Sequence, residues 1–217
     1  MHSRKRLLFL AAVSALGLAA LLFFHEGAAV PLHYGLSGQA DAYGSKWALL
    51  ALAAPPFMGI GAMALTARFA DKAAAEASGR AFAGLTLFFV TLCWLLAAVA
   101  LGGQTQFLPL VPPGLSLLLG ALLCYLAPIL RDAAPNRLTG IRTKATLSDP
   151  VVWQKTHRLA AKTVLAGGLV LMAAAAAALL LPKVAPVLLA IGLCAAVLGL
   201  LAPAVYADRL ARKSAAR

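Results

Sequence analysis

The sequence predicts an all-α membrane protein, a bundle of six transmembrane helices with the N- and C-termini in the cytoplasm. Hydrophobic residues make up 62% of the 217 residues and charged residues only 12%, whereas ordinary globular domains hold about 25% charged residues. The apolar residues fall into six stretches that are each long enough to cross a bilayer. Lysine and arginine gather at the ends of these stretches in a pattern that indicates the orientation of the bundle.

The six stretches each hold roughly 18 to 24 residues, and at about 1.5 Å per residue each covers a hydrocarbon core of about 30 Å. The first follows Arg4, Lys5 and Arg6, as the core of a signal peptide does, but it is longer than the roughly 7 to 15 residues of such a core. We therefore expect an uncleaved helix there. The predicted spans are residues 7–24, 47–66, 81–101, 107–130, 163–181 and 184–206.

Cations near the spans indicate the orientation, because Lys and Arg are retained on the cytoplasmic side. With the N-terminus inside, only Lys46 and Lys183 fall outside. The net charge of +12 therefore indicates topology and not direct nucleic-acid binding, since no nucleic-acid-binding module accompanies it. We predict a multi-pass membrane protein surrounded by the lipid bilayer, with residues 25–46 outside and residues 136–162 in the cytoplasm.

The longest polar segment, residues 136–162, contains in order Asn, Gly-Ile-Arg-Thr, Thr-Leu and Val-Trp-Gln-Lys-Thr-His-Arg. Its composition and spacing resemble the signature of the SdpI family, bacterial integral membrane proteins that confer immunity to a secreted toxin. The resemblance suggests a set of motif or partner-binding residues, namely Asn136, Gly140, Arg142, Thr143, Thr146, Leu147, Trp153, Lys155, His157 and Arg158.

A second motif lies in the outer loop, where the sequence resembles a small domain of unknown function that often precedes the SdpI domain. The residues concerned are Pro31, His33, Gly38, Asp41 and Lys46. We expect this domain in residues 1–66, a third helix with linkers in residues 67–108, and an SdpI-like domain in residues 109–217. The resemblance implies two partners: a secreted peptide toxin, and a cytoplasmic transcriptional repressor that the toxin-engaged protein holds at the membrane.

Residues 149–162 predict an amphipathic helix that leads into the fifth span. Asp149 suits the N-cap and Pro150 the first helical position. At about 100° per residue, one face holds Trp153, Thr156, His157 and Ala160, and the other Lys155, Arg158 and Lys162. We expect Trp153 at the headgroup level and the cations facing lipid phosphates or a partner. His157 is expected to be an interfacial anchor, and an acid-base pair with Asp149 is the alternative.

Upstream of that helix, Asn136, Gly140 and Arg142 predict a tight turn held against the membrane. Asn136 can cap a helix end or adopt a left-handed conformation, and Arg142 can bond several carbonyls or a lipid phosphate at once. For both residues the sequence leaves a structural role and a partner-binding role open.

The outer loop is too polar to face lipid and is rich in turn-forming residues. One interpretation is a metal or peptide site that includes His25, Glu26, His33 and Asp41. The other is a tight loop shaped by its glycines, in which His33 and Asp41 bond backbone groups.

Within the six spans there is no Asp, Glu, Lys, Arg or His. This disfavours an ion-coupled transporter, because such proteins place ionisable groups near the midplane. Proline pairs predict kinked or broken helices at Pro55 and Pro56 and at Pro112 and Pro113. Such helices are the basis of an alternative function, a facilitative exporter or channel for a small peptide or amphiphile, and a ligand-free membrane scaffold is a third.

Small residues in the last two spans, including Gly167 and Gly168, predict close packing of helix backbones. Cys93, Cys124 and Cys194 lie in apolar spans without metal-type spacing, and we expect them to be small core residues. The chain contains no motif of a nucleophilic, zinc or phosphate-binding enzyme. We therefore expect no enzymatic activity, no cofactor and no metal ligand.

Overall fold

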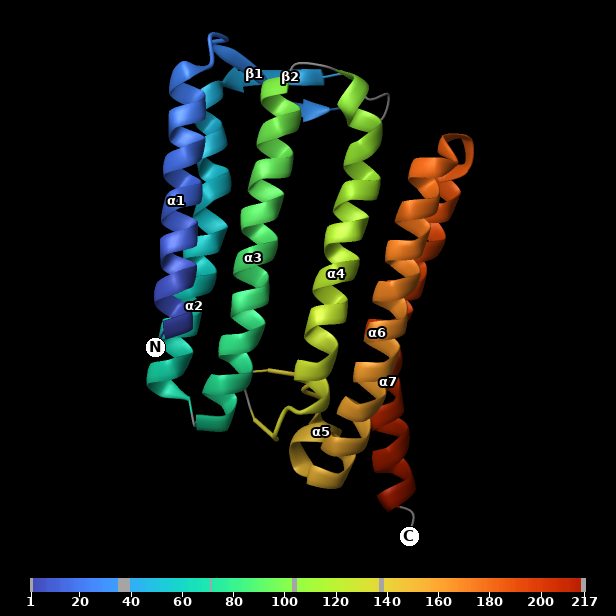
Figure 1. Cartoon of the computed structure of the whole chain (residues 1–217). Coiled ribbons are helices and arrows are strands. Elements are labelled where there is room, and N and C mark those ends of the chain that lie inside the picture. The colour runs from blue at the N-terminus through green and yellow to red at the C-terminus, as the bar shows by residue number, and fades with distance from the viewer. Residues whose placement is uncertain (1, 35–39, 71, 103–104, 137–138, 216–217) are drawn as a thin grey trace.

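Six long helices form the molecule in the computed structural model, which describes residues 2–34, 40–70, 72–102, 105–136 and 139–215 (Figure 1). Six helical segments of this part of the chain are long and apolar enough to cross a membrane, which confirms the predicted number of spans. The long helices are α1 (His2–Phe24), α2 (Ala54–Phe69), α3 (Lys72–Gly102), α4 (Val111–Arg131), α6 (Pro150–Leu180) and α7 (Ala185–Ala215).

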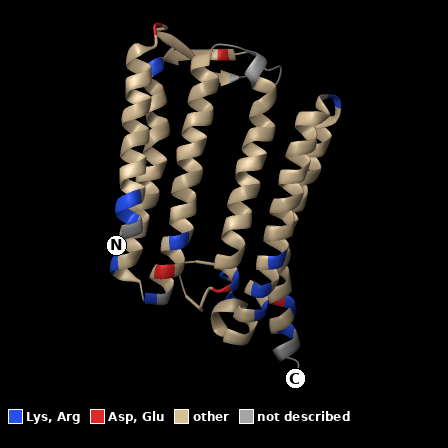
Figure 2. Ribbon diagram, viewed as in Figure 1, with Lys and Arg blue, Asp and Glu red and all other residues tan. Residues whose placement is uncertain are grey.

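Both ends of the chain lie at the end of the bundle that also holds the short helix α5 (Lys144–Ser148), and two strands lie at the opposite end (Figure 1). We call these the α5 end and the hairpin end. Lysine and arginine gather at the α5 end (Figure 2). The short 3₁₀ helix η3 (Pro182–Val184), which contains Lys183, joins α6 to α7 at the hairpin end.

The proline pairs mark junctions between two kinds of helix. A 3₁₀ helix, η1 (Lys46–Ala53), precedes α2, and Pro55 lies in the first turn of α2. A second 3₁₀ helix, η2 (Thr105–Leu110), precedes α4, which has Pro112 in its first turn. Proline is tolerated there because the first turn of an α-helix does not need its N–H groups for intrahelical bonds. The predicted interruptions are therefore changes from 3₁₀ to α geometry.

A β-hairpin replaces the irregular outer loop that the sequence predicted, so the prediction of an all-α fold missed a small sheet. Strands β1 (Ala29–Tyr34) and β2 (Ala40–Ser45) pair antiparallel, with Val30 opposite Gly44 and Pro31 opposite Tyr43. Val30 is 1% exposed and packs with Leu18 and other apolar residues of α1, η1 and α3. This side chain joins the hairpin to the core. Gly38 lies outside the described residues.

Glycine contacts hold α4, α6 and α7 together. A Cβ on Gly168 of α6 would lie 2.9 Å from the carbonyl oxygen of Gly120 in α4, and one on Gly199 of α7 would lie 2.5 Å from that of Thr163. The Thr163 hydroxyl also donates a hydrogen bond of 2.7 Å to the Gly199 carbonyl. The predicted close packing is confirmed, because these backbones approach more closely than any larger residue would allow.

The cysteines do not share one environment. Cys93 is buried and Cys124 is half-buried, but Cys194 is exposed on α7. The expectation that all three are core residues is therefore wrong for Cys194, because its apolar surroundings in the sequence reflect a helix face directed toward lipid.

Candidate functional site

A compact polar cap, residues 133–162, covers the α5 end of α4, α6 and α7. It begins with a turn after α4, where the Asn136 side chain donates a 2.8 Å hydrogen bond to the Ala134 carbonyl and accepts one of 2.8 Å from the Thr139 amide. Asn136 is 8% exposed. Its amide group therefore satisfies backbone groups that burial removes from water, a local pattern typical of Asn in turns.

A capping box starts α5. The Thr143 hydroxyl accepts from the Thr146 amide at 3.2 Å, and the Thr146 hydroxyl accepts from the Thr143 amide at 2.9 Å. The Thr146 hydroxyl also donates to the Ile141 carbonyl at 2.7 Å, and Thr146 is 1% exposed. These two threonines satisfy the amides that a helix leaves open at its start.

Asp149 separates α5 from α6. Its backbone is extended, and its carboxylate accepts from the amides of Val151 at 2.7 Å and Val152 at 3.4 Å, with Pro150 at the first helical position. The predicted helix start is confirmed. Asp149 therefore caps α6 and forms no pair with His157 through its described hydrogen bonds.

Trp153 and His157 form the centre of the cap. Their rings stack at 4.0 Å with an interplanar angle of 19°, and they are 1% and 0% exposed. The Trp153 indole donates to the Ala133 carbonyl at 2.8 Å. His157 contacts the Trp153 carbonyl through Nδ1 at 2.9 Å and accepts from the Ile141 amide through Nε2 at 3.0 Å. These partners require a neutral imidazole that carries its proton on Nδ1.

Gly140 allows the preceding turn to lie against this ring. Its φ is +98°, the only positive φ in the described chain. A Cβ at this position would overlap the His157 ring. Glycine is therefore required at this position for two reasons: the backbone is left-handed, and the turn lies too close to the His157 ring for a Cβ. The structure therefore confirms a tight turn at Gly140, and the described contacts hold it against His157.

Burial corrects the predicted placement of two aromatic residues. Neither the Trp153 nor the His157 side chain is exposed to lipid headgroups, since both are buried within the protein. The face that they share with Thr156 and Ala160 was predicted correctly, because all four are buried. The error concerned what covers that face, which is the turn from α4 to α5 and not lipid headgroups.

The remaining predicted motif residues lie on the outside of the cap. Arg142, Lys155 and Arg158 are exposed, and Leu147 is 51% exposed. The structure thus divides the motif into buried residues that build the cap and exposed residues that can meet a partner. The buried group comprises Asn136, Thr146, Trp153 and His157, with Gly140 and Thr143 half-buried.

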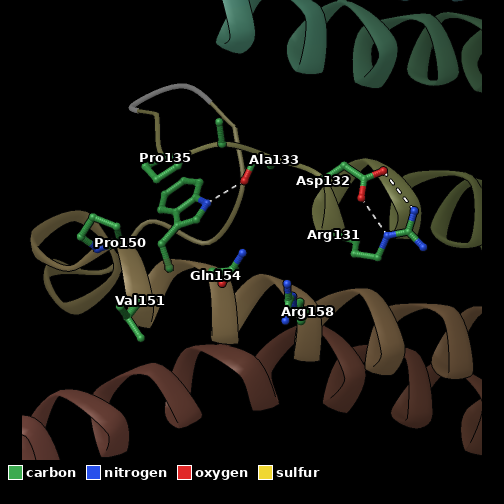
Figure 3. Close-up of a pocket in the computed structure, with 10 residues that line it drawn as sticks. Arg131, Asp132, Ala133, Pro135, Pro150, Val151, Gln154 and Arg158 are labelled. Atoms are coloured by element: carbon green, nitrogen blue, oxygen red, sulfur yellow. Dashed lines mark hydrogen bonds and ion pairs between the residues drawn. The ribbon is translucent and has the colours of Figure 1, made fainter.

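A pocket of about 710 Å³ opens between the end of α4 and the start of α6 (Figure 3). Arg158 and Gln154 line one side, and Arg131 and Asp132 line the other. Arg131 donates to both Asp132 carboxylate oxygens, at 2.8 and 3.1 Å. These hydrogen bonds hold the pKa of the Asp132 carboxyl below its ordinary value. The Asp132 carboxylate is thus already paired with Arg131, whereas Arg158 forms no ion pair with any residue that the structure describes.

Sequence reasoning missed this pocket. Arg131, Asp132 and Gln154 were not among the predicted site residues, and neither was Ala133, whose carbonyl holds Trp153. The adjacent Arg-Asp pair directly after a span was the available indication, because charged residues at a span end often form the rim of an interfacial site. The hydrogen bond that the Ala133 carbonyl accepts could not be predicted, because every residue type has a backbone carbonyl.

At the hairpin end, His33 and Asp41 bond each other at 2.5 Å across the two strands, and both are exposed. The two side chains thus bond each other, a contact that neither interpretation of the outer loop had included. Lys46 donates to the carbonyl of His25 and lies 5.6 Å from the Trp47 ring centre. Pro31 occupies a ladder position. Among the described residues, no three His, Cys, Asp or Glu side chains are grouped as metal ligands would be.

Six spanning helices with a polar cap on one end define a multi-pass α-helical membrane protein. Residues 133–203 match the SdpI/YfhL protein family, and residues 10–58 match a domain of unknown function, DUF1648. The resemblance predicted from the sequence is thereby confirmed: part of the chain matches the SdpI/YfhL family model, and a part before it matches the DUF1648 model. Comparisons with curated proteins and with solved structures found no match.

Proposed function

We propose that this protein is an immunity protein of the SdpI type, which lies in the bacterial inner membrane and protects that membrane against a secreted peptide toxin. The observation that best supports the proposal is the family match over residues 133–203. The matched region starts at Ala133 and includes all of the cap, whose side-chain hydrogen bonds join Ala133 to Trp153, Ile141 to His157 and Thr146 to Ile141.

The hairpin end is the proposed toxin-facing side. Leu32 and Tyr43 are 47% and 66% exposed, beside the exposed His33–Asp41 pair. A surface that combines apolar side chains with one polar pair suits an amphipathic peptide, since the apolar contacts supply affinity and the polar pair supplies orientation. The gathering of cations at the α5 end supports an outward-facing hairpin, because such residues are retained in the cytoplasm.

The α5 end is the proposed docking surface for a cytoplasmic repressor. Arg142, Lys155 and Arg158 are exposed there, and Arg158 lines the pocket of about 710 Å³. Exposed cations beside a partly apolar pocket suit an acidic segment of a partner, because long-range attraction guides the encounter and the pocket buries a side chain. The proposed signalling role uses this surface, and immunity alone does not need it.

Survival of a toxin-sensitive bacterium under a secreted peptide toxin tests the proposal. The unaltered chain, at a measured membrane level, is compared with a hairpin variant, His33→Ala with Asp41→Ala. Its matched control is Glu26→Ala with Lys183→Ala, which removes two exposed charges at the same end. Immunity predicts protection by the unaltered chain and the control, with loss in the hairpin variant. No protection by the unaltered chain would overturn the proposal.

Repressor docking needs a separate readout, a reporter for the expression that the toxin induces. Lys155→Gln with Arg158→Gln is expected to retain protection and to lose induction. Arg209→Gln with Arg212→Gln, two exposed cations of α7 at the same end, is the matched control. Equal induction in both variants would exclude the α6 surface as the docking site. Efflux of a labelled toxin that is lost in Pro56→Leu would instead favour the facilitative exporter.

A further inference from the structure

A groove of about 1070 Å³ opens at the α5 end among α1, α2, α3 and α4, away from the cap. Its polar lining residues are Arg4, Lys72, Glu76 and Arg80, and the rest of its lining is mostly apolar. The groove thus joins a charged mouth to an apolar wall at the place where helices leave the membrane. Basic pockets between transmembrane helices in this position suit lipid headgroups.

A second cavity lies further along α3, between α3 and α4. It has a volume of about 190 Å³ and is lined by Leu87 and Phe88 of α3 and by Leu118 and Leu122 of α4. Tyr125 lines both cavities. The lining residues of α3 recur at intervals of three and four, so they lie along one face of the helix.

The length of this path matches one leaflet of a bilayer. The lining residues of α3 begin with Lys72 at the mouth. From Arg80, the last cation of the mouth, to Thr91 they cover roughly 16 Å at about 1.5 Å per residue. Half of a hydrocarbon core is roughly 15 Å. An acyl chain that starts at the charged mouth can therefore follow the path for the depth of its own leaflet.

Tyr125 divides the polar part of the path from the apolar part. Its hydroxyl donates a 3.1 Å hydrogen bond to the Arg80 carbonyl, and its ring packs against Gly84, where a Cβ would overlap the ring. The ring is thus held between α3 and α4, with its polar end at the mouth. Tyrosine suits the boundary between headgroup and hydrocarbon because one end of it is polar and the other apolar.

The charges at the mouth match a phosphate. Arg4, Lys72 and Arg80 form no ion pair with another described residue, Glu76 included. Asp132 is near enough to Arg80 to be affected by its charge, but its carboxylate is already bonded by Arg131. Among the described lining residues, three cations stand against one acid, so these four side chains together carry a net positive charge.

We propose that this groove is a binding site for an anionic phospholipid, with the phosphate held by Arg4, Lys72 and Arg80 and one acyl chain lying between α3 and α4. The site is separate from the cap and from the hairpin, so it goes beyond the proposed function. A bound lipid fills the space between α3 and α4 and so stabilises the contact between the two helices.

Native mass spectrometry of the purified chain in a nonionic detergent tests the headgroup part. The probes are phosphatidylglycerol and phosphatidylcholine with the same acyl chains. We expect phosphatidylglycerol to bind more tightly, and Arg80→Gln to weaken it roughly fivefold, with about twenty-fivefold for Arg4→Gln with Arg80→Gln, since each cation near an anionic headgroup contributes about one such factor. Arg212→Gln is the charge-matched control and should bind normally.

The acyl part has its own variant, Ala121→Trp, which fills the cavity between α3 and α4. It should weaken phosphatidylglycerol binding, whereas Ala190→Trp on the exposed face of α7 should not. Unchanged melting temperatures without lipid verify that the variants are folded. Equal binding of the two lipids, or unaltered selectivity in Arg80→Gln, would overturn the proposal. Displacement of the lipid by millimolar inorganic phosphate would indicate an anion site without an acyl-chain path.

Discussion

Gly140→Ala is the sharpest test of how the cap is built. The substitution places an alanine at φ +98°, which costs about 1–2 kcal/mol for a residue with a Cβ. The new Cβ also overlaps the His157 ring, so the 3.0 Å bond from the Ile141 amide to Nε2 must break. A buried hydrogen bond lost in this way costs about 1–3 kcal/mol. The sum is about 2–5 kcal/mol of unfolding free energy.

Denaturant titration in detergent micelles measures this loss, and amide hydrogen exchange at Ile141 locates it. We expect faster exchange of that amide in Gly140→Ala, because its acceptor has moved. Gly61→Ala is the control, since nothing lies within 4 Å of its added Cβ in α2, and alanine within a helix stabilises by about 0.5–1 kcal/mol. If Gly140→Ala and Gly61→Ala gave the same unfolding free energy and Ile141 exchange, the proposed role of the turn would be refuted.

Three further substitutions test neighbouring contacts in the same titration. His157→Phe keeps a ring on Trp153 but loses both hydrogen bonds, so we expect a loss of about 1–3 kcal/mol; an unchanged stability would mean that stacking alone holds the cap. Thr146→Val removes the capping box, which should cost about 0.5–2 kcal/mol and speed amide exchange in α5; unchanged exchange there would contradict the capping role. Gly199→Ala places a Cβ 2.5 Å from the Thr163 carbonyl oxygen and should lower the melting temperature by separating α6 from α7; a raised melting temperature would show that the helices separate without loss.

Predictions from the sequence were correct where a structure depends on the bilayer or on residues close by in the chain. The spans could be predicted because a bilayer requires long apolar helices wherever the chain crosses it. The start of α6 could be predicted because Asp149 and Pro150 act on their own neighbours. In both cases the physical cause lies within a few residues or in the solvent.

Prediction failed where a distant segment decides the outcome. Trp153 and His157 were assigned to the interface because their segment has the pattern of an amphipathic interfacial helix. In the structure both are buried, and the Ala133 carbonyl and the Ile141 amide satisfy their polar atoms. The hairpin was missed because Val30 is a single apolar residue whose core neighbours come from other elements. Residue types do not reveal partners that belong to the backbone or to another helix.

The Tyr125 hydrogen bond to the Arg80 carbonyl has a consequence for communication along the molecule. The hairpin packs on α1, η1 and α3, whereas the cap packs on α4, α6 and α7. The main packing contact between these two groups of helices is the interface of α3 with α4. A toxin bound at the hairpin would therefore influence a partner at the cap chiefly through movement of α3 against α4, and the proposed lipid would determine how freely the two helices slide.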